Sequence, residues 1–270
     1  MKTAQSSNAQ IFTDYFRWFE KIGSKYIGNI LSIVDFEKMK KDNDYAKQIF
    51  LFYWAYERQG APGGYKIAAI KSISSCKNVA LKKEFYKYYK GKPNISNNPI
   101  LDKRFLELDI KKIIKCVNNC EFEKAFDALK LNGLGHKIRS FFLRDIAFLA
   151  KIDEKSLVLK DYLYLCPVDI WIRLTIDTMN IEDNETNINK SNYHFSSTKD
   201  FNIAIRLIFT CLQNKVSPIL VNMGIWYFCS RCIGNSERLI ELIQNNNIKV
   251  LENELLLMNG FDDYKISFIN

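Results

Sequence analysis

Apolar residues recur at intervals of three and four along almost the whole chain of 270 residues. This spacing places them on one face of a helix, and no convincing run of alternating apolar and polar residues indicates a strand. The sequence therefore predicts an all-α fold, which at this length forms one large domain or two interleaved lobes. The predicted helices span residues 9–33, 43–58, 65–75, 79–90, 101–116, 121–131, 137–151, 168–180, 199–213, 218–232, 236–246 and 249–258.

The positive charge of the chain is concentrated in one segment. Residues 66–115 contain 13 Lys or Arg against 4 Asp or Glu, so this segment alone has the same net charge as the whole chain, +9. A concentrated positive field favours an acidic partner such as nucleic acid, with an anionic membrane surface as the alternative. Extra lysines on solvated helix faces would give the same count without any partner.

The N-terminal residues and the cysteines bear on the compartment. The first ten residues are polar, and no run reaches the roughly 18 apolar residues of a membrane span. We therefore expect a cytoplasmic protein without a signal peptide or a transmembrane segment. Seven cysteines scattered through apolar segments suit reduced core thiols. Cys229 and Cys232 have metal-like spacing, but no thiol follows them, so we expect a helical core pair and no metal site.

Two amphipathic helical segments meet at the sequence Leu131-Asn132-Gly133-Leu134-Gly135-His136-Lys137. Glycine at positions 133 and 135 permits a left-handed backbone and close approach to a phosphate, and amides at the start of a helix attract anions. Many helical hairpins use glycine only to turn the chain. Lys137 falls where the helix dipole disfavours an ammonium ion, which favours a neutral, nucleophilic amine. A solvated or phosphate-contacting lysine is the alternative.

Together with Pro167-Val168-Asp169, this stretch resembles the helix-hairpin-helix DNA glycosylase superfamily, mainly over residues 121–175. In that family the motif reads Leu-x-Gly-Val/Leu-Gly-x-Lys and is followed by Val-Asp. The interval of 32 residues between Lys137 and Asp169 is longer than in the endonuclease III-like branch. It is similar to the interval in archaeal 8-oxoguanine (GO) glycosylases. The added length, residues 151–165, is expected to hold an extra turn or a short helix.

The resemblance implies a two-lobed helical fold over residues 1–270, with the active site in the cleft between the lobes. The helix-hairpin-helix would occupy about residues 121–151, and the N-terminal and C-terminal helices would form the second lobe. It also implies a base-excision repair enzyme, monomeric and nucleoid-associated, that needs no cofactor. Such an enzyme removes 8-oxoguanine from double-stranded DNA and cleaves the abasic site by β-elimination. Lys137 would attack the sugar to form an imine, and Asp169 would assist, although a residue in that place is also a common helix cap.

Contacts to the DNA backbone are expected from Gly133, Gly135 and Arg139. Arg144 and Arg173 flank the expected site and would also hold phosphates, although surface cations are common.

The damaged base needs partners of its own, because the enzyme must flip it out of the duplex. Gln59 would fill the gap left behind, and Phe141 and Trp226 would stack on the flipped base. Core packing is the alternative for both aromatic residues, and it is the favoured one. His136 varies in the family's motif and is expected to face DNA or solvent.

Three other functions remain open. One is an endonuclease III-like glycosylase for another oxidised base, although the C-terminal cysteine cluster usual in those enzymes is missing. The second is a non-catalytic helix-hairpin-helix protein that binds DNA only through phosphates. The third is a helical scaffold or membrane-surface protein whose basic face meets acidic partners.

Overall fold

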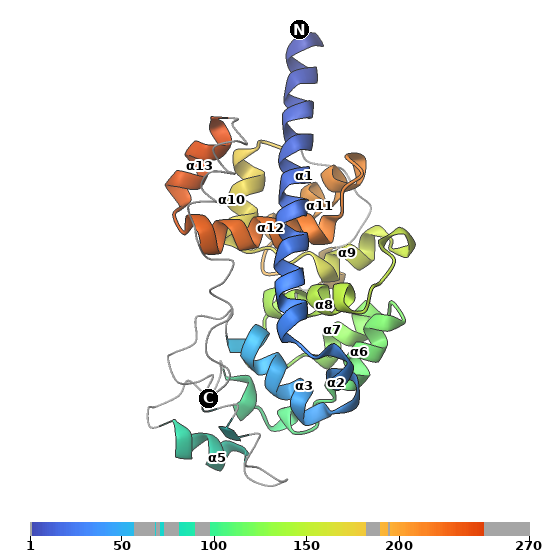
Figure 1. The fold of residues 1–270 in the computed structure, drawn as a ribbon, viewed down its shortest axis with the longest axis vertical. Coiled ribbons are helices and arrows are strands. Elements are labelled where there is room, and N and C mark those ends of the chain that lie inside the picture. Colours follow the sequence, from blue (N-terminus) through green and yellow to red (C-terminus); the bar gives the residue numbers. More distant parts are fainter. Residues whose placement is uncertain are drawn as a thin grey trace. The chain divides into compact units, whose positions relative to one another are not determined.

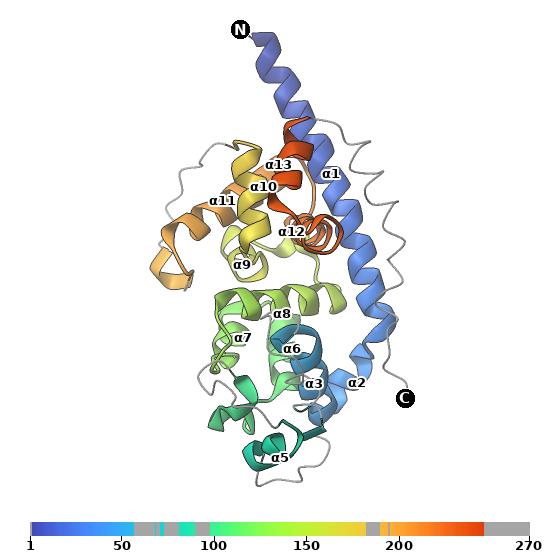
Figure 2. The ribbon, with the colours of Figure 1, turned by 90° about the vertical axis from the view of Figure 1, so that its left-hand side faces the viewer.

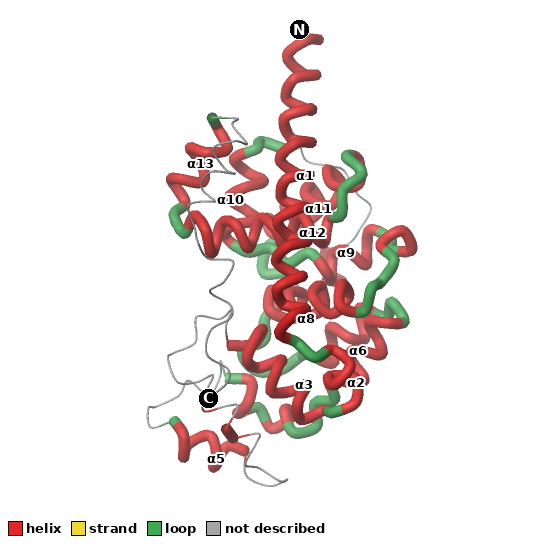
Figure 3. The backbone as a smooth tube through the Cα atoms, viewed as in Figure 1, coloured by secondary structure: helices red, strands yellow, loops and turns green. Residues whose placement is uncertain are grey.

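A computed structural model describes residues 2–56, 68, 71–72, 81–89, 98–181, 190–193 and 195–245. All regular elements among these residues are helical, and none is a strand (Figure 3). The predicted all-α class is therefore confirmed for the described part of the chain. None of the helices described is by itself both long and apolar enough to cross a membrane. The predicted helix at 249–258 and most of the one at 65–75 lie outside the described residues.

The chain forms two compact units. Unit 1 comprises the described parts of Met1–Ile33 and Val158–Asn270, and unit 2 comprises those of Val34–Leu157. The helices of unit 1 are α1 (Lys2–Ile33), α9 (Leu159–Leu165), α10 (Ile170–Thr178), α11 (Thr198–Gln213), α12 (Pro218–Tyr227) and α13 (Ser236–Gln244), together with the 3-10 turn η6 (Lys190–Tyr193) and the π-helical segment η7 (Phe228–Ile233) (Figure 1). Residues from both ends of the sequence thus build one unit.

Unit 2 contains the basic segment and the hairpin. Its α-helices are α2 (Phe36–Lys41), α3 (Asn43–Phe50), α5 (Leu81–Tyr88), α6 (Ile110–Asn118), α7 (Phe122–Ala128) and α8 (His136–Leu149). Its shorter segments are η1 (Leu51–Tyr56), which is π-helical, and the 3-10 turns η3 (Pro99–Leu101), η4 (Lys103–Phe105) and η5 (Glu154–Ser156). The short helix expected between residues 151 and 165 is confirmed, because η5 and α9 both fall within that interval.

One predicted helix, at residues 101–116, is wrong in its first half. The turns η3 and η4 occupy that part, and α6 begins only at Ile110. The cause is a pair of aspartates whose side chains compete for backbone amides. Asp102 accepts a hydrogen bond from the Arg104 amide at 3.0 Å, and Asp109 accepts one from the Lys112 amide at 3.1 Å. Asp102 therefore starts a turn of its own instead of continuing a helix.

The closest helix contact in unit 1 joins α1 to α12, and Figure 2 looks nearly along α12 where it lies against α1. Two glycines allow it. A Cβ at Gly224 would lie 1.8 Å from the carbonyl oxygen of Phe19, and one at Gly23 would lie 1.9 Å from that of Leu220. The two backbones touch directly, so neither glycine can be replaced without moving a helix.

This contact gives a stability prediction. Gly224→Ala should lower the free energy of unfolding by about 2 kcal/mol or more, because the methyl group collides with backbone rather than with a flexible side chain. Gly28→Ala is the matched control, since Gly28 lies in the same helix as Gly23 and a Cβ there meets nothing within 4 Å in the described structure. The control should be neutral or stabilising by up to about 1 kcal/mol. Urea unfolding of the three proteins measures this, and equal stabilities would contradict the close contact.

Candidate functional site

The turn between α7 and α8 is a tight hairpin. The Leu134 amide donates to the Leu131 carbonyl at 3.1 Å, and Gly133 between them has a φ of 76°. A positive φ at the third position of such a turn is typical of type II geometry. Gly133 therefore has a backbone reason to be glycine.

Gly135 does not use the left-handed backbone that glycine permits. It is the N-cap of α8 with φ −67° and ψ 172°, an extended conformation that any residue can adopt. It is exposed, and a Cβ built on it meets no atom of the described residues within 4 Å. The fold itself does not require glycine here, whereas a ligand that approaches the backbone closely would.

A carboxylate that the sequence did not single out holds the hairpin turn. The Asn132 amide donates to Asp102 Oδ2 at 2.8 Å, and Arg104 Nη2 donates to the same oxygen at 2.6 Å. The pKa of Asp102 is held well below its usual range, mainly by the hydrogen bonds from the Arg104 side chain. The short Asp-Lys-Arg sequence after η3 was the available signal, since Asp often caps a turn within two or three residues.

Lys137, the expected nucleophile, lies in the first turn of α8 and is half-buried. It lies in unit 2, as does the whole hairpin. The placement predicted from the sequence, two residues after Gly135 at the start of a helix, is therefore the one found.

The other charged side chains of α8 lie in the interior, which corrects their expected role as surface phosphate contacts. Arg139 is 8% exposed, its guanidinium lies 3.9 Å from the centroid of the Phe126 ring, and burial lowers its pKa. Arg144 is fully buried and forms an ion pair with Asp145 at 2.8 Å. His136 is buried against Phe126 rather than facing DNA or solvent.

The residues expected to handle the base are not displayed on the surface of the described structure. Phe141 is 1% exposed, and the Arg144 guanidinium lies 4.8 Å from its ring centroid. Trp226 is 7% exposed and packs edge-on against Tyr26. Both placements agree with the core-packing alternative. Gln59 lies outside the described residues.

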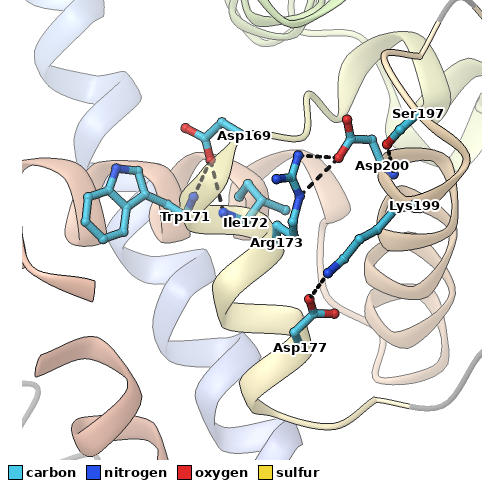
Figure 4. Close-up of polar contacts among 8 residues, drawn as sticks. All are labelled: Asp169, Trp171, Ile172, Arg173, Asp177, Ser197, Lys199 and Asp200. Atoms are coloured by element: carbon cyan, nitrogen blue, oxygen red, sulfur yellow. Dashed lines mark hydrogen bonds and ion pairs between the residues drawn. The ribbon is translucent and has the colours of Figure 1, made fainter. Parts of the chain in front are cut away.

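Asp169, the expected catalytic carboxylate, is the N-cap of α10 (Figure 4). Its Oδ1 accepts hydrogen bonds from the amides of Trp171 and Ile172 at 2.9 and 3.0 Å, and the residue is 8% exposed. The predicted capping role is therefore confirmed. Asn222 of α12, fully buried, donates to the Pro167 carbonyl at 3.0 Å and so fixes the segment that leads to Asp169. Its signal in the sequence was a single amide within the apolar run of α12.

Arg173 lies one turn further along α10 and is the expected phosphate contact that remains partly exposed, with 38% of its side chain accessible. Its Nε and Nη2 donate to Asp200 Oδ1 on α11 at 3.1 and 2.5 Å (Figure 4). Asp200 is 5% exposed. The pair fixes a cation near the N-terminus of α10, and the sequence did not indicate its buried partner.

Of the cysteine pair in η7, Cys229 is buried in the core, as expected, whereas Cys232 is only half-buried. Burial raises the pKa of Cys232 to about 11, and it raises the pKa of Cys229 further still. The Cys229 sulfur lies 3.8 Å from Thr175 Oγ1. Thiols with raised pKa values are weak nucleophiles and weak metal ligands at neutral pH. Among the described residues, no group of three or more His, Cys, Asp or Glu is placed to hold a metal ion.

Comparisons of the chain with protein-family models, with curated proteins and with solved structures found no match. The hairpin with Lys137 lies in unit 2, whereas Asp169 and Arg173 lie in unit 1, and each group is described within its own unit. The function is therefore inferred from the chemistry of each group by itself.

The charge on Asp102 gives a pH prediction. Because its folded-state pKa lies below the ordinary value of 3.8, the carboxylate stabilises the folded state above about pH 4, and this contribution is lost as the pH falls further. Asp102→Asn should lower the free energy of unfolding by about 1–2 kcal/mol at neutral pH. The difference between variant and wild type should shrink as the pH is lowered toward about 3. Thermal unfolding across this range tests it, and a constant difference would contradict it.

Proposed function

We propose that this protein is a DNA glycosylase with abasic-site lyase activity that removes 8-oxoguanine from double-stranded DNA through an imine at Lys137. One observation carries the proposal. A hairpin with an exposed, sterically open glycine at the N-cap of α8 is followed two residues later by a half-buried lysine. Anchor and nucleophile then lie within one turn of one helix.

The hairpin supplies the anchor for the DNA backbone. The first amides of a helix have no partners within the helix, and they carry the positive end of its dipole, so they bind phosphate oxygens. At Gly135 a Cβ would meet no atom of the described residues within 4 Å, which leaves room there for a phosphate. Backbone binding of this kind holds the duplex without reading its sequence.

Lys137 supplies the covalent chemistry. Its ε-amino nitrogen attacks C1′ of the damaged nucleotide as the bond from C1′ to the base nitrogen breaks, and the base leaves with that electron pair. Loss of a proton and opening of the sugar ring give the imine, from which removal of a C2′ proton expels the 3′ phosphate by β-elimination. The amine is regenerated when water hydrolyses the imine, so no cofactor enters the balance.

Asp169 supplies negative charge beside the sugar. Two amides hold its Oδ1 on the cap of α10, so the carboxylate has one orientation. A fixed carboxylate stabilises the positive charge that develops on the sugar as the base departs, and it can take up a proton from the incoming amine.

A non-catalytic hairpin protein that only binds DNA is the second candidate. The burial of Phe141 and Trp226 favours it, because a glycosylase must offer a pocket to the flipped base. It predicts salt-sensitive DNA binding without release of any base.

Borohydride trapping on a duplex with one 8-oxoguanine tests the mechanism. The wild type should form a covalent adduct and Lys137→Gln should form none, because reduction captures only the imine. Lys130→Gln, which removes an exposed lysine at the other end of the same turn, is the control and should trap normally. Asp169→Asn should release base at least about 100-fold more slowly while binding DNA nearly as well. An adduct that persists in Lys137→Gln would exclude this lysine as the nucleophile.

The two glycines can be separated by serine substitutions. Gly135→Ser should keep or raise the stability of the protein, because Ser is a good N-cap, yet weaken duplex binding by about tenfold as its side chain enters the phosphate's space. Gly133→Ser should cost about 1 kcal/mol of stability, because it forces a positive φ on a residue with a Cβ. Fluorescence anisotropy and thermal unfolding measure the two effects. Unchanged binding by Gly135→Ser would show that DNA does not reach this position.

A further inference from the structure

We infer that Arg104 is a second phosphate contact beside the hairpin, and that Asp102 is the residue that positions it there. This inference rests on the proposed function, since it assigns a further residue to the same DNA-binding surface. Arg104 comes from η4, outside the helix-hairpin-helix itself.

Arg104 lies close to the hairpin. Arg104 Nη2 and the Asn132 amide bond the same oxygen of Asp102, at 2.6 and 2.8 Å. The guanidinium therefore lies within two hydrogen-bond lengths of the hairpin backbone. Asn132 is the residue just before Gly133, and it is exposed. A phosphate bound at the hairpin would lie close to this cation.

The pairing with Asp102 fixes the orientation of the Arg104 guanidinium. Arg104 Nε donates to Asp102 Oδ1 at 3.0 Å while Nη2 donates to Oδ2, so the pairing is side-on and bidentate. This pairing uses two of the three guanidinium nitrogens, and the third, Nη1, can donate to a further acceptor. The Arg104 side chain is 48% accessible, whereas the Asp102 side chain is only 4% accessible. The cation thus faces solvent while the carboxylate stays behind it.

Arg104 also offsets the negative charge of the Asp102 carboxylate. Without Arg104, the Asp102 carboxylate would be a buried negative charge bonded directly to the hairpin turn, and it would repel a phosphate at that turn. The bidentate cation cancels this charge and presents its own donors outward. Lys103, next to Arg104 in the sequence, is also exposed and adds to the positive charge.

The salt dependence of DNA binding tests the assignment. Each phosphate contact that a protein neutralises adds about 0.9 to the slope of log affinity against log salt concentration. Arg104→Ala should therefore weaken binding to an undamaged duplex by about tenfold at moderate salt and reduce the slope by about 1. Arg238→Ala is the matched control, because Arg238 pairs with Glu241 at 2.8 Å, is 41% accessible and lies in unit 1. It should leave both quantities unchanged.

Asp102→Asn separates charge from hairpin order. It weakens the tie to the hairpin but keeps the Arg104 charge, so it should lower the melting temperature and retain the wild-type salt slope. If Asp102→Asn lost affinity and also showed the reduced salt slope expected of Arg104→Ala, the order of the hairpin would explain both effects. That result would overturn the inference. If the wild type bound the duplex and Arg104→Ala had the same affinity and the same salt slope, the inference would be overturned but the proposed function would not. No duplex binding by the wild type would overturn the proposed function along with it.

Discussion

The direct backbone contact between α1 and α12 is the constraint on which unit 1 depends. It exists only because Gly23 and Gly224 lack side chains, and it brings the N-terminal helix onto a helix some 200 residues later in the sequence. The consequence reaches the candidate site through Asn222, which lies two residues before Gly224. Its amide holds the Pro167 carbonyl, and Asp169 follows directly. A glycine contact between helices thereby helps to fix the position of Asp169 at the start of α10.

Unit 2 positions the hairpin by a similar sequence of polar contacts. Lys47 of α3, although 7% exposed, donates to the Leu106 carbonyl at 2.9 Å, and Asn43 bonds both the Leu108 carbonyl and the Ile110 amide. These bonds fix the irregular segment that contains Asp102, which in turn fixes the turn at Asn132. In both units, polar side chains that bond backbone groups help to fix the position of a loop.

Sequence periodicity and local chemistry were sufficient for most of the helices, though not for the first half of the one predicted at 101–116, and for the site residues that depend on their neighbours in sequence. The cap at Asp169, the turn at Gly133 and the place of Lys137 are of this kind. Partners distant in sequence were not accessible. Asp102 with Asn132, Asn222 with Pro167 and Asp200 with Arg173 are separated by 27 to 55 residues, and no pattern in one sequence pairs them. The sequence also does not distinguish an extended glycine such as Gly135 from a left-handed one such as Gly133.

The buried charges of α8 show why the arginines were placed wrongly and what their burial achieves. A charged residue is buried only when a partner offsets its desolvation, and here Asp145 bonds Arg144 Nε at 2.9 Å and Trp54 Nε1 at 2.8 Å. Such a network fixes the rotation of α8 about its own axis, since any other rotation would leave a buried charge unpaired. Lys137, Phe141 and Arg144 follow one stripe of α8 at helical spacing. Because Arg144 and Phe141 are fixed in the interior, the stripe reaches the surface only at its start, where the half-buried Lys137 lies beside the hairpin.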